Sequence, residues 1–409
     1  MDNREVYLDN AATTPINHNV LEVMLPFLKE NYGNPSSLHK FGRISKSAIE
    51  NSRNKISQII NCEPSEIIFT SGGTEANNLA ILGIARANKN KGKHIIVSSI
   101  EHKSILDACK VLEKEEFEID YLDVDKNGLV KLEDLKNKIR KDTILVSIMY
   151  ANNEVGSIQP IKEISRFLKG LSMKSKTNNE QRLTNNFPLF HCDACQAVNY
   201  LPVDIKKIGV DSLTISASKI YGPKGTGILY VNKKIKIAPL IVGGGQERGL
   251  RSGTPNVAFI VGTASALKIS EMKREKESER LTKLRDYFLL QIKKKIKGII
   301  VNGGMKNRLP NNLNISVKGV EGETLLLILD DKNIYCSTGS ACSSMDLNPS
   351  YVLVNMGLPL GFIHCSIRFG LGRHTNKADI DYTVKVLSES INKIRAMSPA
   401  PLNDFKVES

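Results

Sequence analysis

Apolar runs of strand length alternate with helix-like stretches from about residue 65 to residue 230. Seven runs fit this description: EIIFTSG, HIIVSSI, FEIDYLDV, TILVSIMY, PLFHCDA, SLTISAS and GILYV. This alternation predicts an α/β fold in which a mainly parallel seven-stranded sheet lies between helices, and ligand sites in such folds lie at the carboxyl ends of the strands. Polar residues that follow these runs are therefore the first candidates for chemistry.

After about residue 260 the pattern changes to long helices with a few strands, such as NNLNISVKG and SIRFGLG. We predict a large α/β domain over residues 15–260 and a smaller α+β domain made of residues 1–14 and 261–409. The segment LSMKSKTNNEQRLTNNF, residues 171–187, is polar and rich in Asn, Lys, Ser and Thr. Its composition is typical of a flexible surface insertion.

The composition narrows the class of protein. The chain has 409 residues, of which 41% are hydrophobic and 24% charged, and no window approaches the ~18 apolar residues of a membrane span. Seven cysteines without a signal peptide favour reduced thiols, so we expect a cytoplasmic protein without membrane contact. The net charge of +14 is spread over helical stretches with interleaved glutamates, so we expect no direct nucleic-acid binding.

A glycine turn between an apolar run and a helix-like stretch is a candidate anion site. In FTSGGTEANNLAILG, residues 69–83, Gly73 would leave backbone N–H groups free at the helix start, and the Thr74 hydroxyl would join them. A phosphate fits such a site. An ordinary glycine turn with a capping threonine explains the same residues equally well.

A carboxylate ends one of the buried runs. In FHCDACQAV, Asp193 follows an apolar strand, where an unpaired charge is costly, so it needs a cationic partner such as a protonated pyridine nitrogen. Gln196, just beyond the strand, is suited to a phenolic oxygen. The rival interpretation is a redox pair or half a metal site formed by Cys192 and Cys195. No second pair stands at zinc spacing, and we expect no resident metal.

Further polar residues follow other runs. His102, in SSIEHKSILDA, is suited to stack on a ring or relay a proton, although a lone histidine is usually structural. Asn152 and Asn153, in IMYANNEVG, are either turn formers or hydrogen-bond donors to a ligand. In TISASKIYGPKGTG the phosphate-loop pattern is not met, so attention falls on Lys219 rather than on the glycines.

Two residues in the last quarter of the chain have unusual surroundings. Cys342 lies in the small, polar stretch YCSTGSACSSMDLNPSYVL, which predicts an accessible thiol. Arg368 lies inside the apolar run of CSIRFGLGRH, where a guanidinium is expected only if it meets an anion such as a substrate carboxylate.

A phosphate site, a buried aspartate, a stacking histidine and a lysine after a strand are the groups that hold pyridoxal 5'-phosphate. At this point the chain resembles the cysteine desulfurases of the NifS/IscS type, within the class V aminotransferase family of fold-type I enzymes. The resemblance runs through the motifs YLDNAATTP, GNPSS, TSGGTEANN, EHKSIL, NNEVG, DACQAV, SKIYGPKG, GGGQERGLRSGTPN, GSACSS and SIRFGLGR.

The resemblance implies a role for each candidate residue. It makes Lys219 the lysine that forms a Schiff base with the cofactor, and Cys342 the sulfur acceptor. The groups that it places around the cofactor are Asp193 at the ring nitrogen, His102 stacked on the ring, Gln196 and Asn153 at the phenolic oxygen, and Gly73, Thr74, Ser216 and Ser218 at the phosphate. Arg368, with Asn153, would face the substrate carboxylate. Thr254 would reach the phosphate site of a second subunit, which implies a homodimer.

The implied activity is removal of sulfur from L-cysteine, which gives L-alanine and a persulfide on Cys342. The sulfur would pass to an iron-sulfur scaffold protein or another acceptor, with tRNA thiolation as a further destination, and Cys342 would be a transient cluster ligand. The chain departs from the family at Ser218, where histidine is usual, at residues 171–187, and in the tail RAMSPAPLNDFKVES. Selenocysteine lyase, another class V activity and a non-catalytic sulfur-assembly scaffold are the alternatives.

Overall fold

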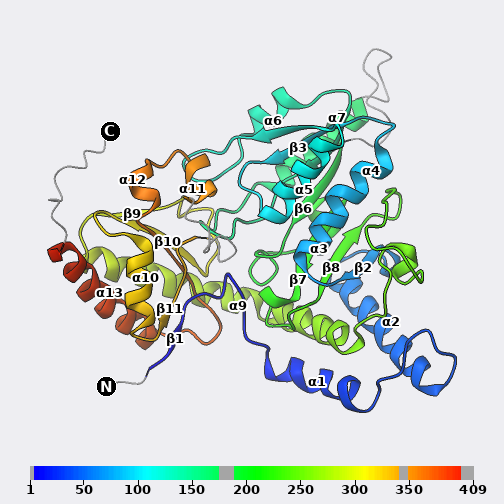
Figure 1. Cartoon of the computed structure of the whole chain (residues 1–409), viewed down its shortest axis with the longest axis horizontal. Coiled ribbons are helices and arrows are strands. Elements are labelled where there is room, and N and C mark those ends of the chain that lie inside the picture. Colours follow the sequence, from blue (N-terminus) through cyan, green and yellow to red (C-terminus); the bar gives the residue numbers. More distant parts are fainter. Residues whose placement is uncertain (1–3, 175–187, 340–348, 398–409) are drawn as a thin grey trace.

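A seven-stranded sheet forms the centre of the larger part of the molecule (Figure 1). The computed structural model describes residues 4–174, 188–339 and 349–397. The strands lie in the order β2 (Ile67–Thr70), β8 (Gly227–Val231), β7 (Ser212–Ser216), β6 (Leu189–Asp193), β5 (Thr143–Ser147), β3 (His94–Ser98) and β4 (Glu118–Leu122). Only β8 runs antiparallel to its neighbours in this sheet. The predicted mainly parallel sheet is confirmed.

Helices cover both faces of this sheet because both faces are apolar. Adjacent strand residues such as Ile95 and Ile96 are fully buried and belong to different hydrophobic clusters, as expected when successive side chains point to opposite faces. One face packs on α3 (Gly73–Asn78), η2 (Leu79–Gly83), α4 (Ile84–Asn88) and α5 (Lys103–Lys114). The other packs on α1 (His18–Lys29), α2 (Lys40–Ile60), α7 (Ile161–Lys174) and α8 (Ile205–Ile208). The short helix α6 (Leu132–Lys138) contacts β4.

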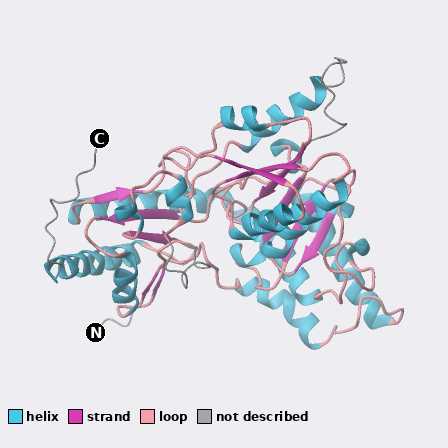
Figure 2. Ribbon diagram, turned by 45° about the horizontal axis from the view of Figure 1, so that its top comes forward, coloured by secondary structure: helices cyan, strands magenta, loops and turns pink. Residues whose placement is uncertain are grey.

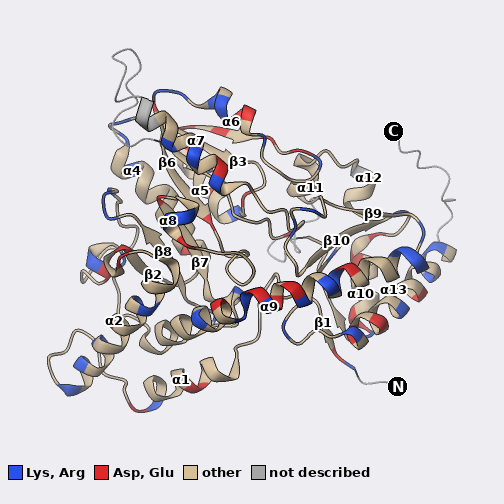
Figure 3. Cartoon of the chain, turned by 180° about the vertical axis from the view of Figure 1, so that it is seen from behind, with Lys and Arg blue, Asp and Glu red and all other residues tan. Residues whose placement is uncertain are grey.

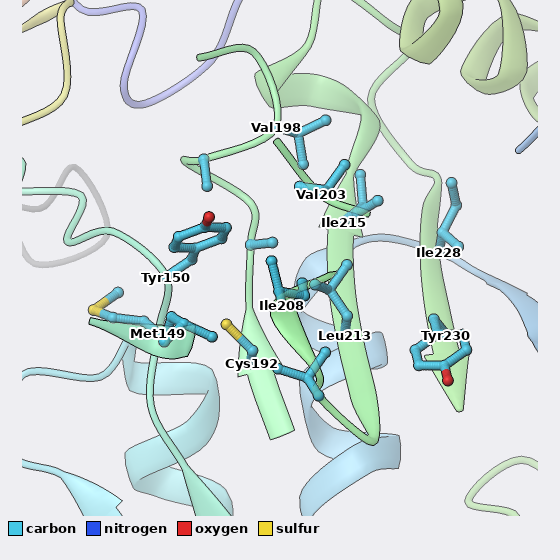
Figure 4. Packing of buried hydrophobic residues seen from close by; sticks show 14 of the residues in the cluster. Met149, Tyr150, Cys192, Val198, Val203, Ile208, Leu213, Ile215, Ile228 and Tyr230 are labelled. Atoms are coloured by element: carbon cyan, nitrogen blue, oxygen red, sulfur yellow. The ribbon is translucent and has the colours of Figure 1, made fainter. Parts of the chain in front are cut away.

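The second of these faces fixes the strands that carry the candidate site. Cys192 of β6 and Leu213 and Ile215 of β7 lie in one packed group with Tyr150, which follows β5 (Figure 4). All four side chains are buried. Because this packing holds β5, β6 and β7 in register, the residues after their carboxyl ends are placed rigidly.

The remaining strands form two small sheets in the other part of the molecule (Figure 2). An antiparallel sheet has the order β12 (Ser366–Gly370), β10 (Asn312–Val317) and β9 (Ile299–Val301). The strand β1 (Val6–Tyr7) pairs in parallel with β11 (Ile334–Tyr335). The helices that follow α9 (Val257–Lys295) are α10 (Gly322–Asp330), α11 (Tyr351–Asn355), α12 (Leu360–Ile363) and α13 (Lys377–Met397). Val352 and Leu353 of α11 and Ile363 of α12 belong to the core of the larger part. The pairing of β1 ties the start of the chain to elements more than three hundred residues away.

The helix α9 (Val257–Lys295) joins the two parts. Its first half contributes Ile260 and Leu267 to the core beneath the seven-stranded sheet, and its second half contributes Phe288 and Ile292 to the core of the other part. Its middle carries mainly Lys, Arg, Asp and Glu (Figure 3). The domain boundary predicted at residue 260 therefore falls inside a continuous helix, and the division into domains stays a prediction.

Two sequence expectations concern segments outside the sheets. The predicted insertion at 171–187 begins as the end of α7, which continues to Lys174, and its remainder lies outside the described residues. None of the helices in the described ranges is both long and apolar enough to cross a membrane.

We predict that Phe288→Ala lowers the free energy of unfolding by about 3–5 kcal/mol, because a fully buried ring that packs edge-on against Phe369 would be replaced by a cavity. Leu290→Ala, two residues further along α9 and half exposed, is the matched control and should cost less than about 1 kcal/mol. Urea unfolding of both variants measures the difference. Equal losses of unfolding free energy in the two variants would show that the Phe288 face of α9 is not part of the hydrophobic core.

Candidate active site

The predicted site residues come from the carboxyl ends of neighbouring strands. His102 follows β3, Asn153 follows β5, Asp193 ends β6 and Ser216 ends β7. These four strands are parallel to their neighbours within the group, so their carboxyl ends meet at one edge of the sheet. The fold therefore gathers residues that are far apart in sequence, as the sequence analysis expected.

Asp193 is a buried carboxylate with uncharged hydrogen-bond donors. The side chain is 6% exposed. Its Oδ2 accepts a hydrogen bond from Asn77 Nδ2 at 2.7 Å, and its Oδ1 accepts one from the backbone N–H of Cys195 at 2.8 Å. Burial and the nearby Asp193 raise the pKa of the Cys195 thiol well above its ordinary value, so the thiol adds no second negative charge. Uncharged hydrogen-bond donors lower the free-energy cost of burying the Asp193 charge, but they do not neutralise that charge.

The glycine turn and the end of β7 approach each other closely. A Cβ built on Gly73 would lie 3.0 Å from Cys195 Sγ and 3.4 Å from Ser216 Cβ, so the start of α3 lies close to the end of β7, and a larger residue would fit only if the Cys195 thiol shifted. The Ser216 and Ser218 hydroxyl oxygens lie 3.0 Å apart. Thr74 follows Gly73 and is exposed. Backbone N–H groups and hydroxyls thus converge in a space suited to an anion.

A segment near the start of the chain lies over the lysine. The Lys219 ammonium donates a hydrogen bond to the backbone oxygen of Ala12. Gln196 Nε2 donates to Ala11 O at 2.9 Å, and both the backbone N–H and the hydroxyl of Thr14 donate to Ser218 O at 2.9 Å. The motif DNAATTP therefore forms a wall of the site, a role that its sequence alone did not reveal.

Arg368 meets an anion, and the anion that the structure shows is Asp9 rather than the predicted substrate carboxylate. The side chain is 1% exposed, its Nη2 forms an ion pair with Asp9 Oδ1 at 2.8 Å, and its Nη1 donates to Asn153 O at 3.1 Å. Its Nε and the Oδ1 of Asn153 are buried and have no partner in the described part of the chain. Asp9 was missed by the sequence analysis, although its place in the YLDN motif was visible. The unsatisfied Nε leaves a donor for a further oxygen.

His102 begins α5 and lies in a polar network. Its Nδ1 accepts a hydrogen bond from the backbone N–H of Ser104 at 3.2 Å and lies 2.9 Å from the Ser104 hydroxyl. Ser104 in turn contacts Asn77. The network explains how a half-buried ring at a helix start is held in place, and it links His102 to the partner of Asp193.

Two predicted residues remain, Thr254 and Cys342. Thr254 is exposed and lines a hollow of about 220 Å³ together with Arg251 and with Ser71, which directly precedes the glycine turn. Cys342 lies outside the described residues. Cys192 and Cys195 are both free thiols, and no cluster of potential metal ligands occurs within the described ranges.

Comparisons with known proteins agree with this arrangement. A family model described as Aminotransferase class-V matches residues 6–383. The chain is 52% identical over 396 residues to "Cysteine desulfurase IscS" of Dictyoglomus turgidum, with 97% of each chain covered. It is 47% identical over 405 residues to the protein of the same name from Methanosarcina thermophila, with 99% of this chain and 96% of the other covered.

Solved structures give the same result. A NifS-like protein has a TM-score of 0.87 at 37% identity, with 95% of this chain and 100% of that chain covered. A NifS-like protein from Rickettsia africae has a TM-score of 0.82 at 31% identity, with the same coverage. The chain belongs to the class V aminotransferase family, with the fold of the NifS-like enzymes. The family resemblance and the fold class predicted from the sequence are confirmed.

Pyridoxal 5'-phosphate is the cofactor of this family, and the residues of the site fit it. A buried carboxylate held by neutral donors, Asp193, suits a protonated ring nitrogen. The close approach of Gly73 to Ser216 suits a phosphate, and Lys219 ends the short helix η3 (Ala217–Lys219) that directly follows Ser216. The predicted cofactor is confirmed, whereas the individual residue roles stay predictions.

We predict that His191 makes stability depend on pH. Burial lowers the pKa of His191 to about 4, while an unfolded histidine has a pKa of about 6.5. Between these values the unfolded state binds the extra proton, so the contribution of His191 is present above about pH 6.5 and is lost as the pH falls toward about 4. From neutral pH to about pH 4, the wild type should lose roughly 2–4 kcal/mol more than His191→Gln.

Urea unfolding of both proteins across this pH range measures the difference. The glutamine side chain introduced by His191→Gln cannot titrate but can still donate and accept hydrogen bonds, so the comparison isolates the proton. Parallel curves for the two proteins would contradict the prediction.

Proposed function

We propose that this protein is a cysteine desulfurase, which removes sulfur from L-cysteine with pyridoxal phosphate and leaves L-alanine. The observation that carries the proposal is the buried carboxylate of Asp193 at the sheet edge, close to the glycine turn and to the Lys219 segment. Relatives that cover nearly the whole chain carry this activity in their names. A solved neighbour with 34% identity and a TM-score of 0.76 is titled "SspA in complex with cysteine".

In this proposal, different residues hold the ring and the phosphate of the cofactor. Asp193 would accept a hydrogen bond from the ring nitrogen, and His102 would lie against the ring. The phosphate would bind the N–H groups at the start of α3 with the hydroxyls of Thr74, Ser216 and Ser218. Because Ser218 brings no positive charge at the position where the family resemblance implies histidine, we expect the phosphate contacts to rest on hydrogen bonds more than on charge.

In this proposal, Lys219 transfers the proton and Cys342 accepts the sulfur. Bound pyridoxal phosphate supplies an electron sink for the pair left at Cα of the amino acid. Arg368 would hold the substrate carboxylate, and the Lys219 amine would take the Cα proton on its Nζ and later return one. The Cys342 thiolate would attack the substrate sulfur, so that the C–S bond breaks, the carbon side keeps the electron pair and is protonated to alanine, and a persulfide remains on Cys342.

Further parts of the proposal concern partners and location. Thr254 is exposed, and we propose that it completes the phosphate site of a second copy in a homodimer. An iron-sulfur scaffold or another sulfur acceptor would receive the persulfide sulfur, with Cys342 as a transient cluster ligand. The six cysteines in the described residues are free thiols, which is typical of a reducing compartment and supports a cytoplasmic location.

We predict that Cys342→Ala lowers alanine production from L-cysteine by at least about a thousandfold, because the nucleophile that accepts the sulfur is removed. Binding of pyridoxal phosphate, seen as visible absorption of the purified protein, should be unchanged. Cys62→Ala removes a different free thiol and should keep full activity. Full alanine production by Cys342→Ala would defeat the proposed sulfur transfer.

We predict that Arg368→Lys raises the KM for L-cysteine roughly tenfold or more with a smaller change in kcat, because lysine keeps the charge but loses the planar array of donors. Arg285→Lys is the matched control: Arg285 is also buried, and its Nη1 donates to Leu309 O at 3.0 Å in the same part of the molecule. Steady-state kinetics of the two variants tests the role. A KM unchanged in Arg368→Lys would exclude Arg368 as the carboxylate site.

A further inference from the structure

Asn77 occupies the centre of a buried polar network behind the candidate site. It lies in α3, is 1% exposed and was not among the residues predicted from the sequence. Its Nδ2 lies 2.7 Å from Asp193 Oδ2 and 2.9 Å from Ser104 Oγ, and its Oδ1 lies 3.4 Å from His191 Nε2. One amide therefore contacts the predicted partner of the cofactor ring nitrogen and two further polar side chains.

The chemistry of these groups fixes the orientation of the amide. The Asp193 carboxylate only accepts hydrogen bonds, so the amide nitrogen must face it, and the amide oxygen then faces His191. Because that oxygen only accepts, His191 Nε2 donates to it, and His191 Nδ1 lies 2.8 Å from Ser212 Oγ. Burial lowers the pKa of His191, so the ring is neutral and its unprotonated Nδ1 accepts a hydrogen bond from the Ser212 hydroxyl.

The second hydrogen of the amide extends the network to His102. Asn77 Nδ2 has two hydrogens, and its two acceptors are Asp193 Oδ2 and Ser104 Oγ. Because Ser104 Oγ accepts from Asn77, its own hydrogen is available to His102 Nδ1, 2.9 Å away. The carboxylate proposed for the ring nitrogen and the imidazole proposed for the ring face are thus both tied to one side chain.

We propose that Asn77 is a positioning residue for the cofactor, and that neutral His191 acts through it. In this assignment His191 orients the amide, and the amide holds the Asp193 carboxylate directly and His102 through Ser104. The inference rests on the cofactor named in the proposed function, but not on the desulfurase reaction. It assigns a role to four side chains, Asn77, Ser104, His191 and Ser212, that the proposed mechanism does not otherwise use.

The test is the affinity of the full-length apoprotein for pyridoxal phosphate, measured by titration. Asn77→Ala should weaken binding roughly 10- to 100-fold, the range typical when a group that orients a ligand-holding side chain is removed. Asn88→Ala is the matched control, because Asn88 is also a 1% exposed helical asparagine, and its amide donates to Ile84 O and Lys236 O instead. The control should bind the cofactor within about threefold of the wild type.

A double-mutant cycle separates positioning from general destabilisation. His191→Leu should weaken cofactor binding in the wild-type background but have little further effect in Asn77→Ala, because His191 acts through Asn77. His191→Gln keeps a donor toward the amide and should restore most of the affinity that His191→Leu loses. If Asn77→Ala does not fold, the comparison of His191→Leu with His191→Gln tests the positioning role by itself.

The outcomes that overturn the inference are specific. They are wild-type affinity in Asn77→Ala, additive effects of the two substitutions, or equal losses in His191→Leu and His191→Gln. A wild-type protein that binds pyridoxal phosphate but makes no alanine from cysteine would instead defeat the proposed function and leave this test in force.

Discussion

The burial of one negative charge at the carboxyl end of β6 is the constraint around which the site is built. Asp193 lies at the end of a fully buried strand, and the groups that donate to it, an asparagine amide and a backbone N–H, are uncharged. Such a carboxylate costs stability until a cation arrives. In the proposed function, the polar side chains around it serve the binding of a cationic ring, whereas the apolar faces of the sheet stabilise the fold.

The two parts of the molecule meet in the site through the beginning of the chain. Asp9 reaches Arg368 of the small antiparallel sheet, and three residues later Ala12 receives a hydrogen bond from Lys219 of the large part. Between them, the backbone N–H of Asn10 donates to Gly370 O. The segment thus sets the spacing between the group proposed for the substrate carboxylate and the group proposed for the Cα proton.

The sequence was sufficient to predict the elements that depend on neighbouring residues in the chain. Most strands of the large sheet are buried apolar runs, and the partly exposed β4 alternates polar and apolar residues, so all seven strands were found from the sequence. A charge inside or at the end of an apolar run drew attention to Asp193 and Arg368. The residues that contact Asp193 and Arg368 across the fold could not be found in this way. Asn77 lies 116 positions before Asp193, Asp9 lies 359 positions before Arg368, and a single Asn or Asp in a polar stretch has no distinguishing pattern. The two-residue strands β1 and β11 are likewise too short to show a period.

The long helix that joins the parts also limits how the molecule can move. Thirty-nine residues of α9 run without interruption, with one half embedded in each core. A hinge at this connection would have to break consecutive backbone hydrogen bonds, and helices normally yield only by gentle bending unless proline, glycine pairs or a bulge weakens them. Rigid-body closure of one part onto the other is therefore disfavoured, and folding already sets the spacing between Arg368 and Lys219, the two groups proposed to act on the amino acid.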